Sequence, residues 1–475
     1  MTKRGQTKTG GRPATTGLIQ GRYALSVGMP NKALPDGWRW TSLSDVARLE
    51  SGHTPSRKHP EYWGGEIPWI GIKDATENYG RKIQDTHQHT NELGIANSSA
   101  RVLPPNTVCL SRTASVGYVV VMGRPMATSQ DFVNWVCSSA IDYRYLKYIL
   151  ISERESFLRF ASGTTHQTIY FPEVKGFHVA LPPIEEQRAI ACVLGALDDK
   201  IELNRRMNET LEATARALFK SWFVDFDPVR AKAEGREPRL SKTLAELFPN
   251  AFEESELGAI PKGWEIKKLG DLFSLQKGLS YKGEHLNAGG VSMVNLGCFV
   301  GRGRFETRAL KQYSGEFQQR HIIHVGDLVL ANTDITQKRE VIGSPGIVPP
   351  SLNDDVCIFT HHVFAARFNN GFERWRLFAF YSLLRDEFRD RATGFATGTT
   401  VLALPQDAVL DFQFAAPLPA LLDAFSDITQ SILARKWNSD VESCRLAELR
   451  DALLPKLISG ELQLMEAERH VGATL

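Results

Sequence analysis

The sequence contains the same pattern twice, and this internal repeat limits the possible fold more than any other feature. Residues 34–56 align with 260–282 at an offset of 226 positions, and residues 160–183 align with 395–418 as a second pair in the same order. Two collinear matches indicate a duplication rather than coincidence. The matched residues are Gly37, Trp38, Leu43, Asp45 and Gly52 with Gly263, Trp264, Leu269, Asp271 and Gly278, and Gly163, Thr164 and Thr165 with Gly398, Thr399 and Thr400.

Each copy of the repeat, residues 34–183 and 260–418, predicts a mixed α/β globular domain. Short runs of alternating apolar residues, separated by Gly, Pro and Asn, predict strands, and one longer amphipathic run in each copy predicts a helix. The expected fold class is therefore α+β. The expected strands lie in 67–74, 107–123, 291–297 and 326–344, and the expected helices are 142–159 and 372–390.

After each domain the apolar residues change to alternating steps of three and four, which is the period of a coiled coil. The first such segment is residues 184–223, with two asparagines in its seam, and Asp227-Pro228 predicts its end. The second is residues 419–460. The predicted seam residues are Ile190, Leu194, Leu197, Ile201, Asn204, Asn208, Leu211 and Leu218 in the first helix, and Phe425, Ile432, Leu446 and Leu453 in the second.

Helices of this length reach roughly 55–60 Å at about 1.5 Å per residue. A single apolar stripe that long cannot be buried against one small domain, so we expect the two helices to pair. Antiparallel pairing, with a domain at the start of each helix and a pseudo-twofold axis between them, avoids a long return crossing. Residues 224–259 are then a linker and residues 461–475 a C-terminal tail.

Charge and cysteine usage indicate a cytoplasmic protein. The formal net charge is only +2, but residues 1–33 carry six basic residues and no acidic one, so we expect a disordered basic tail there. The beginning of the chain lacks the apolar core of a signal peptide, and no apolar run is long enough to span a membrane. The six cysteines lie far apart without a C-x-x-C pair, which is typical of reduced thiols.

No motif for catalysis is found. A phosphate-binding loop and a dinucleotide-binding fingerprint are absent. Asp85, His87 and His89 have the spacing of metal ligands on one face of a strand, but we favour a polar surface strand and expect no metal and no bound cofactor. The E-x-K triplets at 173–175 and 265–267 fit solvated charges better than a nuclease site. A self-sufficient nuclease or DNA methyltransferase with an unrecognised site remains the alternative.

Two similar but non-identical domains on a spacer of fixed length suit the reading of two different DNA segments at a set distance. Polar turns between paired strands are the candidate readers, because Arg and Lys favour guanine edges and Asn and Gln favour adenine. Glycine amides and hydroxyls suit phosphate contacts. The candidates are Lys73, Arg112, Thr113, Ser115, Thr128, Ser129, Gln130, Gly163 and Thr164 in the first copy, and Asn332, Thr333, Thr336, Gln337, Lys338, Arg339, Gly398 and Thr399 in the second.

From about residue 34 to 464 the chain resembles the specificity (S) subunit of Type I restriction–modification systems. The resemblance rests on the two Gly-Trp openings, on LPPIEEQRAIACVLGALDDKIELNRRMNETLEATARALFKSWFVDFDPV at 181–229, and on LLPKLISGELQL at 453–464. The second helix departs from the pattern, with Pro417-Leu418-Pro419 and no Glu-Gln pair where the first copy has Glu186-Gln187.

The resemblance implies two target-recognition domains, each reading one half of an asymmetric, bipartite site in double-stranded DNA, with a coiled coil that sets the spacer. It also implies a non-catalytic role in an adenine-specific methyltransferase and endonuclease complex. The implied partners are two methyltransferase (modification) subunits and the restriction subunits that translocate and cleave. On this reading S-adenosylmethionine, ATP and magnesium belong to those partners.

Overall fold

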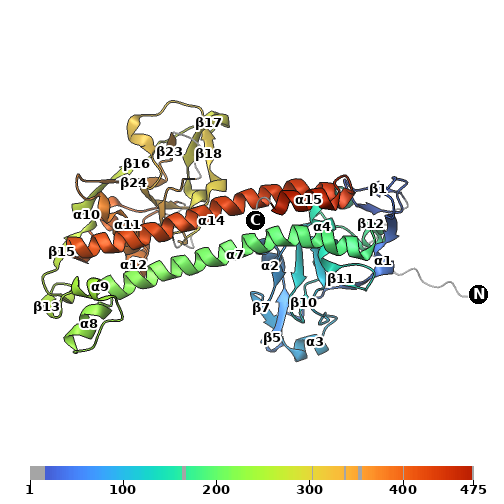
Figure 1. Ribbon diagram of the computed structural model, residues 1–475, viewed down its shortest axis with the longest axis horizontal. Coiled ribbons are helices and arrows are strands. Elements are labelled where there is room, and N and C mark those ends of the chain that lie inside the picture. Colours follow the sequence, from blue (N-terminus) through green and yellow to red (C-terminus); the bar gives the residue numbers. More distant parts are fainter. Residues whose placement is uncertain are drawn as a thin grey trace, which may run out of the picture. The chain divides into compact units, whose positions relative to one another are not determined.

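The structure is a computed structural model that describes residues 17–162, 167–301, 303–335, 339–350, 356–398 and 401–472. It has two compact units, unit 1 (residues 1–202 and 443–475) and unit 2 (residues 203–442), which are described separately (Figure 1). Each unit contains mixed β-sheets with short helices, and two long helices, α7 and α14, contribute to both. The predicted α+β class is confirmed.

The β-structure of unit 1 forms three sheets, whose strand orders are β4-β11-β8-β9-β6, β10-β5-β7 and β1-β2-β12-β3. Their strands are short, and the core lies between them and α4, α5 and the start of α7. The bounds are β1 Ile19–Gln20, β2 Leu25–Val27, β3 Arg39–Ser42, β4 Ala47–Ser51, β5 Trp63–Ile70, β6 Lys82–Ile83, β7 Gln88–Thr90, β8 Val108–Ser111, β9 Val119–Met122, β10 Ala127–Thr128, β11 Phe132–Cys137 and β12 Phe177–Leu181.

Unit 2 repeats this arrangement with β16-β24-β20-β22, β18-β17-β23-β19 and the pair β15-β26, and adds the pairs β21-β25 and β13-β14. Its core is rich in aromatic side chains from α11, the end of α7 and the start of α14. The bounds are β13 Phe252–Ser255, β14 Gly258–Pro261, β15 Glu265–Lys268, β16 Phe273–Lys277, β17 Leu286–Val294, β18 Lys311–Tyr313, β19 Ile322–Ile323, β20 Leu328–Ala331, β21 Thr333–Asp334, β22 Pro345–Ile347, β23 Cys357–Phe359, β24 Val363–Phe368, β25 Leu402–Ala403 and β26 Gln413–Ala416.

The two units share details of strand pairing that the sequence repeat alone does not reveal. In unit 1, β5 pairs in parallel with β10 and antiparallel with β7, and Thr90 lies opposite both Trp63 and Ile67 across a bulge. In unit 2, β17 pairs in parallel with β23 and antiparallel with β18, and Tyr313 lies opposite both Leu286 and Val291 across the same kind of bulge. A bulge inserts extra residues in one strand at a defined place, so its recurrence defines equivalent positions in the two units.

Short helices complete both units. The predicted helices 142–159 and 372–390 are each divided in two, because the chain turns at Glu153 and at residues 383–385. The predicted strand at 67–74 ends at Ile70, where Gly71 begins a helix. The bounds are α1 Leu43–Val46, α2 Ile72–Glu77, α3 Glu92–Ala96, α4 Tyr143–Ser152, α5 Arg154–Phe160, α6 Phe171–Lys175, α8 Asp227–Ala233, α9 Lys242–Glu246, α10 Leu269–Leu272, α11 Arg376–Ser382, α12 Asp386–Phe395, α13 Gln406–Leu410 and α15 Leu464–Gly472.

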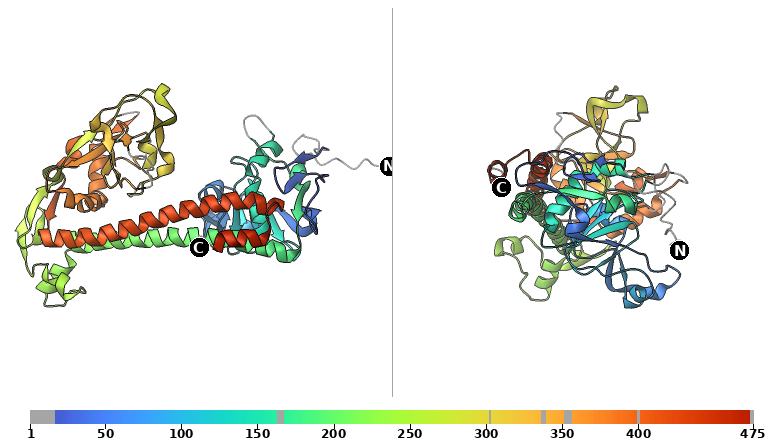
Figure 2. Two further views of the ribbon diagram at one scale, coloured as in Figure 1. Left: turned by 45° about the horizontal axis from the view of Figure 1, so that its top comes forward. Right: turned by 90° about the vertical axis from the view of Figure 1, so that its right-hand side faces the viewer.

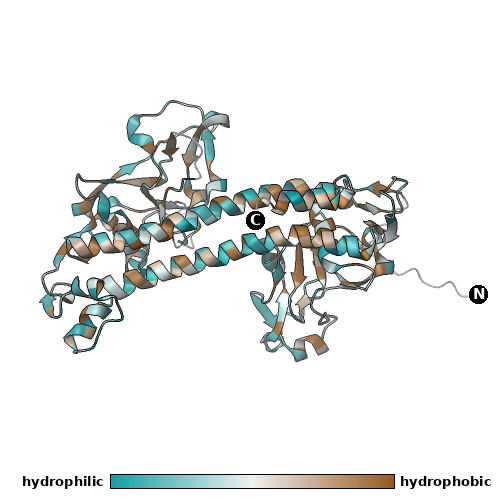
Figure 3. Cartoon of the chain, in the orientation of Figure 1, coloured by the Kyte–Doolittle hydropathy of each residue, from teal (hydrophilic) through white to brown (hydrophobic). Residues whose placement is uncertain are grey.

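Helices α7 (Ile184–Phe223) and α14 (Pro419–Ser459) lie side by side (Figure 2). Within unit 2 the contacts run in opposite directions along the two helices, since Asn204 bonds to Glu442 and Glu212 pairs with Lys436. This is the predicted antiparallel order. Brown and teal segments alternate along both helices in Figure 3, as expected for helices with one apolar face.

One prediction about the beginning of the chain is wrong. Residues 17–33 are not a free tail, because β1 and β2 join the sheet of β12 and the carboxylate of Glu153 accepts the backbone N–H groups of Arg22 and Ala24 at 2.7 and 2.8 Å. Residues 1–16 lie outside the described residues. The predicted linker 224–259 packs on unit 2, since Val229 and Phe248 are buried in its core. Burial of apolar side chains such as Leu25 and Val27 also helps to hold residues 17–33 in place.

Candidate nucleic-acid interface

In unit 1 the polar turns come together at one end of the sheets. Because β10 lies parallel to β5, the segments that follow both strands leave the sheet together, and Ser129 N donates to Ile70 O at 3.0 Å. His53 N donates to Thr128 O at 2.9 Å, and Arg112 N donates to Asp131 O at 2.7 Å. We call residues 51–57, 71–74, 111–117, 129–131 and 167–169 the unit 1 loop cluster.

Unit 2 builds the same cluster with the same backbone hydrogen bonds. Thr360 N donates to Val294 O at 2.9 Å, Leu279 N to Phe359 O at 2.8 Å, and Asn332 N to His362 O at 3.0 Å. These bonds define equivalent residues in the two units. Equivalent pairs, written with unit 1 first, are Arg112 and Asn332, Ser129 and Thr360, Gln130 and His361, and Asp131 and His362.

The repeated glycines Gly52 and Gly278 have a physical explanation in these clusters. A Cβ on Gly52 would lie 1.9 Å from Ser129 O, and a Cβ on Gly278 would lie 2.3 Å from Thr360 O. No side chain fits at such distances, so each glycine allows the loop after its strand to approach the neighbouring loop. The match between these glycines in the sequence therefore reflects the packing of two backbones.

The predicted readers Arg112 and Asn332 point into their clusters. Arg112 Nη2 donates to Gln130 O at 3.1 Å, and Asn332 Nδ2 donates to His361 O, the equivalent oxygen, at 3.0 Å. Burial lowers the pKa of Arg112, although the charge of Asp131 opposes this effect. Both side chains thus hold the next loop in place.

Four of the predicted readers are buried in the structure. Thr128 and Ser129 are 2% and 1% exposed, and Asn332 and Thr333 are 3% and 9% exposed. Each side chain has a partner within its own unit: Thr128 Oγ1 accepts from Asn134, Ser129 Oγ donates to Asp131, and Thr333 Oγ1 bonds to His362 Nδ1 at 2.8 Å. Polar side chains buried with internal partners support loops instead of reaching a ligand.

Of the other predicted readers, those that the structure describes lie at or near the surface. Thr113 Oγ1 bonds to Thr168 Oγ1 at 2.8 Å, and Ser115 lies in the same turn. The side chain of Lys73 is 67% exposed, on α2. Gln130 and Arg339 are exposed, and Gly398 has a φ of +126°. Gly163, Thr164, Thr336, Gln337, Lys338 and Thr399 lie outside the described residues.

The sequence did not lead to the prediction of three cationic side chains, Arg57 in unit 1 and Lys277 and Lys311 in unit 2. The Arg57 guanidinium lies 3.8 Å from the ring centre of Trp63, and its Nη2 donates to Gln88 at 2.7 Å. In unit 2, Lys277 and Lys311 lie in the strands that border His361. The alignment of the two copies, extended through β7 and β18, is the signal that would have found them.

The predicted seam residues divide between the units. In unit 1, Ile190, Leu194, Leu197, Leu446 and Leu453 are buried in the core, and Ile201 packs against it. In unit 2, Phe425 is buried, Leu218 and Ile432 pack against the core, and Leu211 is half-buried.

The asparagines of the seam are buried in unit 2 and form polar contacts between α7 and α14. Asn204 Nδ2 donates to Glu442 at 2.8 Å, and Asn208 Nδ2 donates to Asp440 at 2.7 Å. Burial raises the pKa of Asp440, although the charge of Lys436 and the bond from Asn208 oppose this effect. A buried Asn that bonds across a helix pair favours one register over its neighbours.

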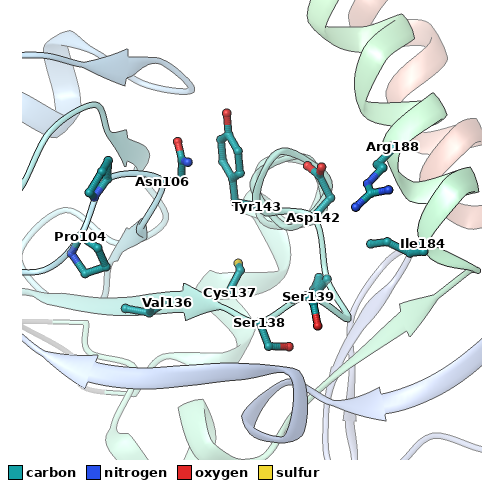
Figure 4. Close-up of a pocket in the computed structure, with 12 residues that line it drawn as sticks. Pro104, Asn106, Val136, Cys137, Ser138, Ser139, Asp142, Tyr143, Ile184 and Arg188 are labelled. Carbon is teal, nitrogen blue, oxygen red and sulfur yellow. The ribbon is translucent and has the colours of Figure 1, made fainter.

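No metal site is found among the residues that the structure describes. His87 bonds to Asp74 at 2.7 Å and His89 bonds to Asp85 at 2.7 Å, so Asp85, His87 and His89, whose spacing resembles that of metal ligands, are engaged in two separate pairs. A pocket of about 380 Å³ opens between the end of β11, the start of α4 and the first turn of α7 (Figure 4). Burial raises the pKa of Cys137 in its wall to about 12, so this thiol is not an activated nucleophile.

The known proteins that the chain resembles are specificity subunits of Type I restriction enzymes. A family model described as "Type I restriction modification DNA specificity domain" matches residues 35–213. The "Type I restriction enzyme MjaIX specificity subunit" of Methanocaldococcus jannaschii is 28% identical over 447 residues, which cover 91% of this chain and 95% of that protein. The HindI specificity subunit of Haemophilus influenzae is 25% identical over 497 residues, covering 90% and 99%.

A solved structure shares the fold. The S subunit of a Type I restriction–modification system from M. genitalium superposes with a TM-score of 0.52 at 16% identity, and covers 90% of this chain and 98% of that one. None of the described helices is long and apolar enough to cross a membrane.

Proposed function

We propose that the chain, which is similar over about 90% of its length to specificity subunits of Type I restriction enzymes, reads one half of an asymmetric, bipartite sequence in double-stranded DNA with each of its units. The observation that carries the proposal is the pair of equivalent loop clusters. Both are built on the same backbone hydrogen bonds, but Arg112, Gln130 and Asp131 of unit 1 are replaced by Asn332, His361 and His362 in unit 2.

To read two different half-sites, the two units need different side chains on the same backbone scaffold. Base edges in the major groove are distinguished by the positions of hydrogen-bond donors and acceptors, so specificity depends on side-chain identity at fixed places. Gln130 is exposed beside the buried and fixed Ser129, and His361 occupies the equivalent place in unit 2. Within the loop clusters, we propose these two positions as base-reading residues.

The long helices provide the spacer and, in this proposal, the surface to which two methyltransferase subunits bind. The chain itself carries out no chemical step. Methyl transfer to adenine, translocation and cleavage then belong to the modification and restriction subunits, together with S-adenosylmethionine, ATP and magnesium. The expected compartment is the cytoplasm, where these partners meet DNA.

Exchange of one domain tests this proposal. Residues 34–183 are replaced by the corresponding segment of a relative with a different DNA target, and methylated adenines are mapped after co-expression with the modification subunit. We expect one half of the recognised sequence to change while the other half and the gap stay the same. A change in both halves contradicts the separate reading by each unit. DNA cleavage or methylation by the purified chain alone would contradict the non-catalytic role.

A further inference from the structure

Four side chains with basic groups meet at the loop cluster of unit 2. The rings of His361 and His362 lie 3.9 Å apart, and the ring of Tyr281 lies 6.3 Å from that of His361. Lys311 Nζ donates to Tyr281 OH at 2.8 Å. We call Lys277, Lys311, His361 and His362 the unit 2 basic cluster.

The backbone holds the parts of this cluster together. Lys277 lies opposite Phe364 in the pairing of β16 with β24, two residues beyond His362. His361 N donates to Leu279 O at 2.9 Å, which joins the loop after β16 to the turn that carries both histidines. Because these bonds belong to the sheet scaffold, the four basic groups converge without needing a ligand to gather them.

The charge of this cluster is not balanced by nearby carboxylates. Neither Lys277 nor Lys311 forms an ion pair within the described part of the chain, and Lys277 is exposed. Burial and the positive charges of His361, Lys277 and Lys311 lower the pKa of His362. The ammonium groups of Lys277 and Lys311 give this partly open surface a positive potential that favours an anion.

Unit 1 provides an internal comparison, since its equivalent positions carry no basic side chain. Through the pairing of β4 with β11, Ser51 is equivalent to Lys277, and through the pairing of β5 with β7, Gln88 is equivalent to Lys311. Gln130 and Asp131 take the places of His361 and His362. The shared fold therefore does not require lysines at these two positions, and unit 1 instead places Arg57 on Gln88 and Arg112 on the carbonyl of Gln130.

We propose that Lys277 and Lys311 of the unit 2 basic cluster bind a phosphate group of the DNA backbone. The inference rests on the proposed function, because the phosphodiester is that of the DNA duplex read by the chain. Lysine ammonium groups and histidine N–H groups are ordinary donors to phosphate oxygens, and such contacts fix the orientation of a protein on DNA without reading sequence.

The test is the salt dependence of DNA binding by the full chain. The double variant Lys277→Ser with Lys311→Gln places the residues of unit 1 in unit 2. The control variant Lys242→Ser with Lys262→Gln makes the same change in net charge at two exposed lysines of unit 2 outside the cluster. Binding to a fluorescent duplex of mixed sequence is measured from low to moderate salt, and thermal unfolding is measured for all variants.

Each neutralised phosphate contributes about −0.9 to the slope of log K against log salt concentration. We expect the double variant to lose about one unit of slope and the control variant to keep the slope of the original chain. Lys311→Gln alone, a smaller change, is expected to weaken binding in the same direction and serves if the double variant unfolds. An unchanged slope in folded variants, or a changed recognition sequence, overturns the phosphate site. Failure of the original chain to bind any duplex overturns the proposed function instead.

Discussion

Asp198 joins three helices in unit 1, and its replacement gives the sharpest prediction for stability. Its Oδ2 accepts hydrogen bonds from Lys147 Nζ at 3.0 Å and from Tyr148 OH at 2.6 Å, both on α4. Its Oδ1 accepts from Arg450 Nη1 of α14 at 2.9 Å. The side chains of Asp198, Lys147 and Arg450 are 24%, 12% and 28% exposed, so water screens these charges only in part.

Asp198→Asn keeps the size of the side chain but removes the carboxylate that pairs with Lys147, and it leaves Arg450 paired with the exposed Asp451. Removing one partner of a buried ion pair costs about 3–5 kcal/mol. Because Asp198 retains some contact with water, we expect the lower end, about 3 kcal/mol in the free energy of unfolding of unit 1. Asp451→Asn is the matched control, since Asp451 also bonds to Arg450 but is 64% exposed. Exposed pairs contribute at most about 1 kcal/mol.

The effect depends on pH in a definite direction. Burial raises the pKa of Asp198, but the charges of Lys147 and Arg450 and the bond from Tyr148 outweigh it, so the pKa is lowered. The unfolded carboxyl has a pKa of about 3.9. The stabilisation by Asp198 is thus fully present above that pH and is lost as the pH falls through the folded pKa.

The assay is urea denaturation followed by hydrogen exchange in peptides from α4 and the start of α7, which reports on unit 1 by itself. Equal losses for Asp198→Asn and Asp451→Asn would refute the reasoning. The reasoning would also be refuted if the difference in free energy of unfolding between the original chain and Asp198→Asn stayed the same below the folded pKa of Asp198. At such a pH the carboxyl is protonated and no longer carries the charge.

Two further predictions concern the loops and the spacer. Gly52→Ala and Gly278→Ala each place a Cβ against a carbonyl oxygen, so we expect weaker DNA binding and a loss of about 1–3 kcal/mol of stability from overpacking. Gly394→Ala, a helical position with nothing within 4 Å, should instead be neutral or stabilising, as thermal unfolding would show. Seven residues added in register to both α7 and α14 lengthen the helix pair by about 10 Å, and methylation mapping should show a gap wider by about three base pairs. The same insertion beside the exposed Gly235 should leave the gap unchanged.

The parts of the fold that could be predicted are those with a periodic pattern or a repeated one. The seam from Ile190 onward predicts α7 because a heptad period sustained over many turns fits a long helix and hardly any other structure. The equivalence of the turns at Arg112 and Asn332 follows from the order of strands in each copy. Lys277 lies in a segment that the sequence repeat already aligns, opposite Ser51, but the equivalence of Lys311 and Gln88 could be found only after strand pairing had aligned the copies, because the segments in between have little sequence in common.

The N-terminal strands could not be predicted, for a physical reason that the structure makes clear. β1 and β2 have two and three residues, which is too short for any period. What holds them is the carboxylate of Glu153, more than a hundred positions away, whose side chain is fully buried and accepts several backbone N–H groups. A buried carboxylate needs such donors, but sequence gives no sign of which N–H groups supply them.

The duplicated scaffold separates residues that hold a loop from residues free to change. At the position of Arg112 and Asn332 the side chains differ, yet both donate to the same carbonyl oxygen of the next loop. That carbonyl belongs to Gln130 in unit 1 and to His361 in unit 2, whose own side chains are not needed for this bond. The Gln130 side chain accepts a hydrogen bond from Thr54 and the His361 ring lies against that of His362, but the backbone at both positions is fixed by other bonds, so a substitution there can change specificity without changing the fold. Gln130 and His361 are therefore better candidates for reading bases than the buried polar residues on either side of them.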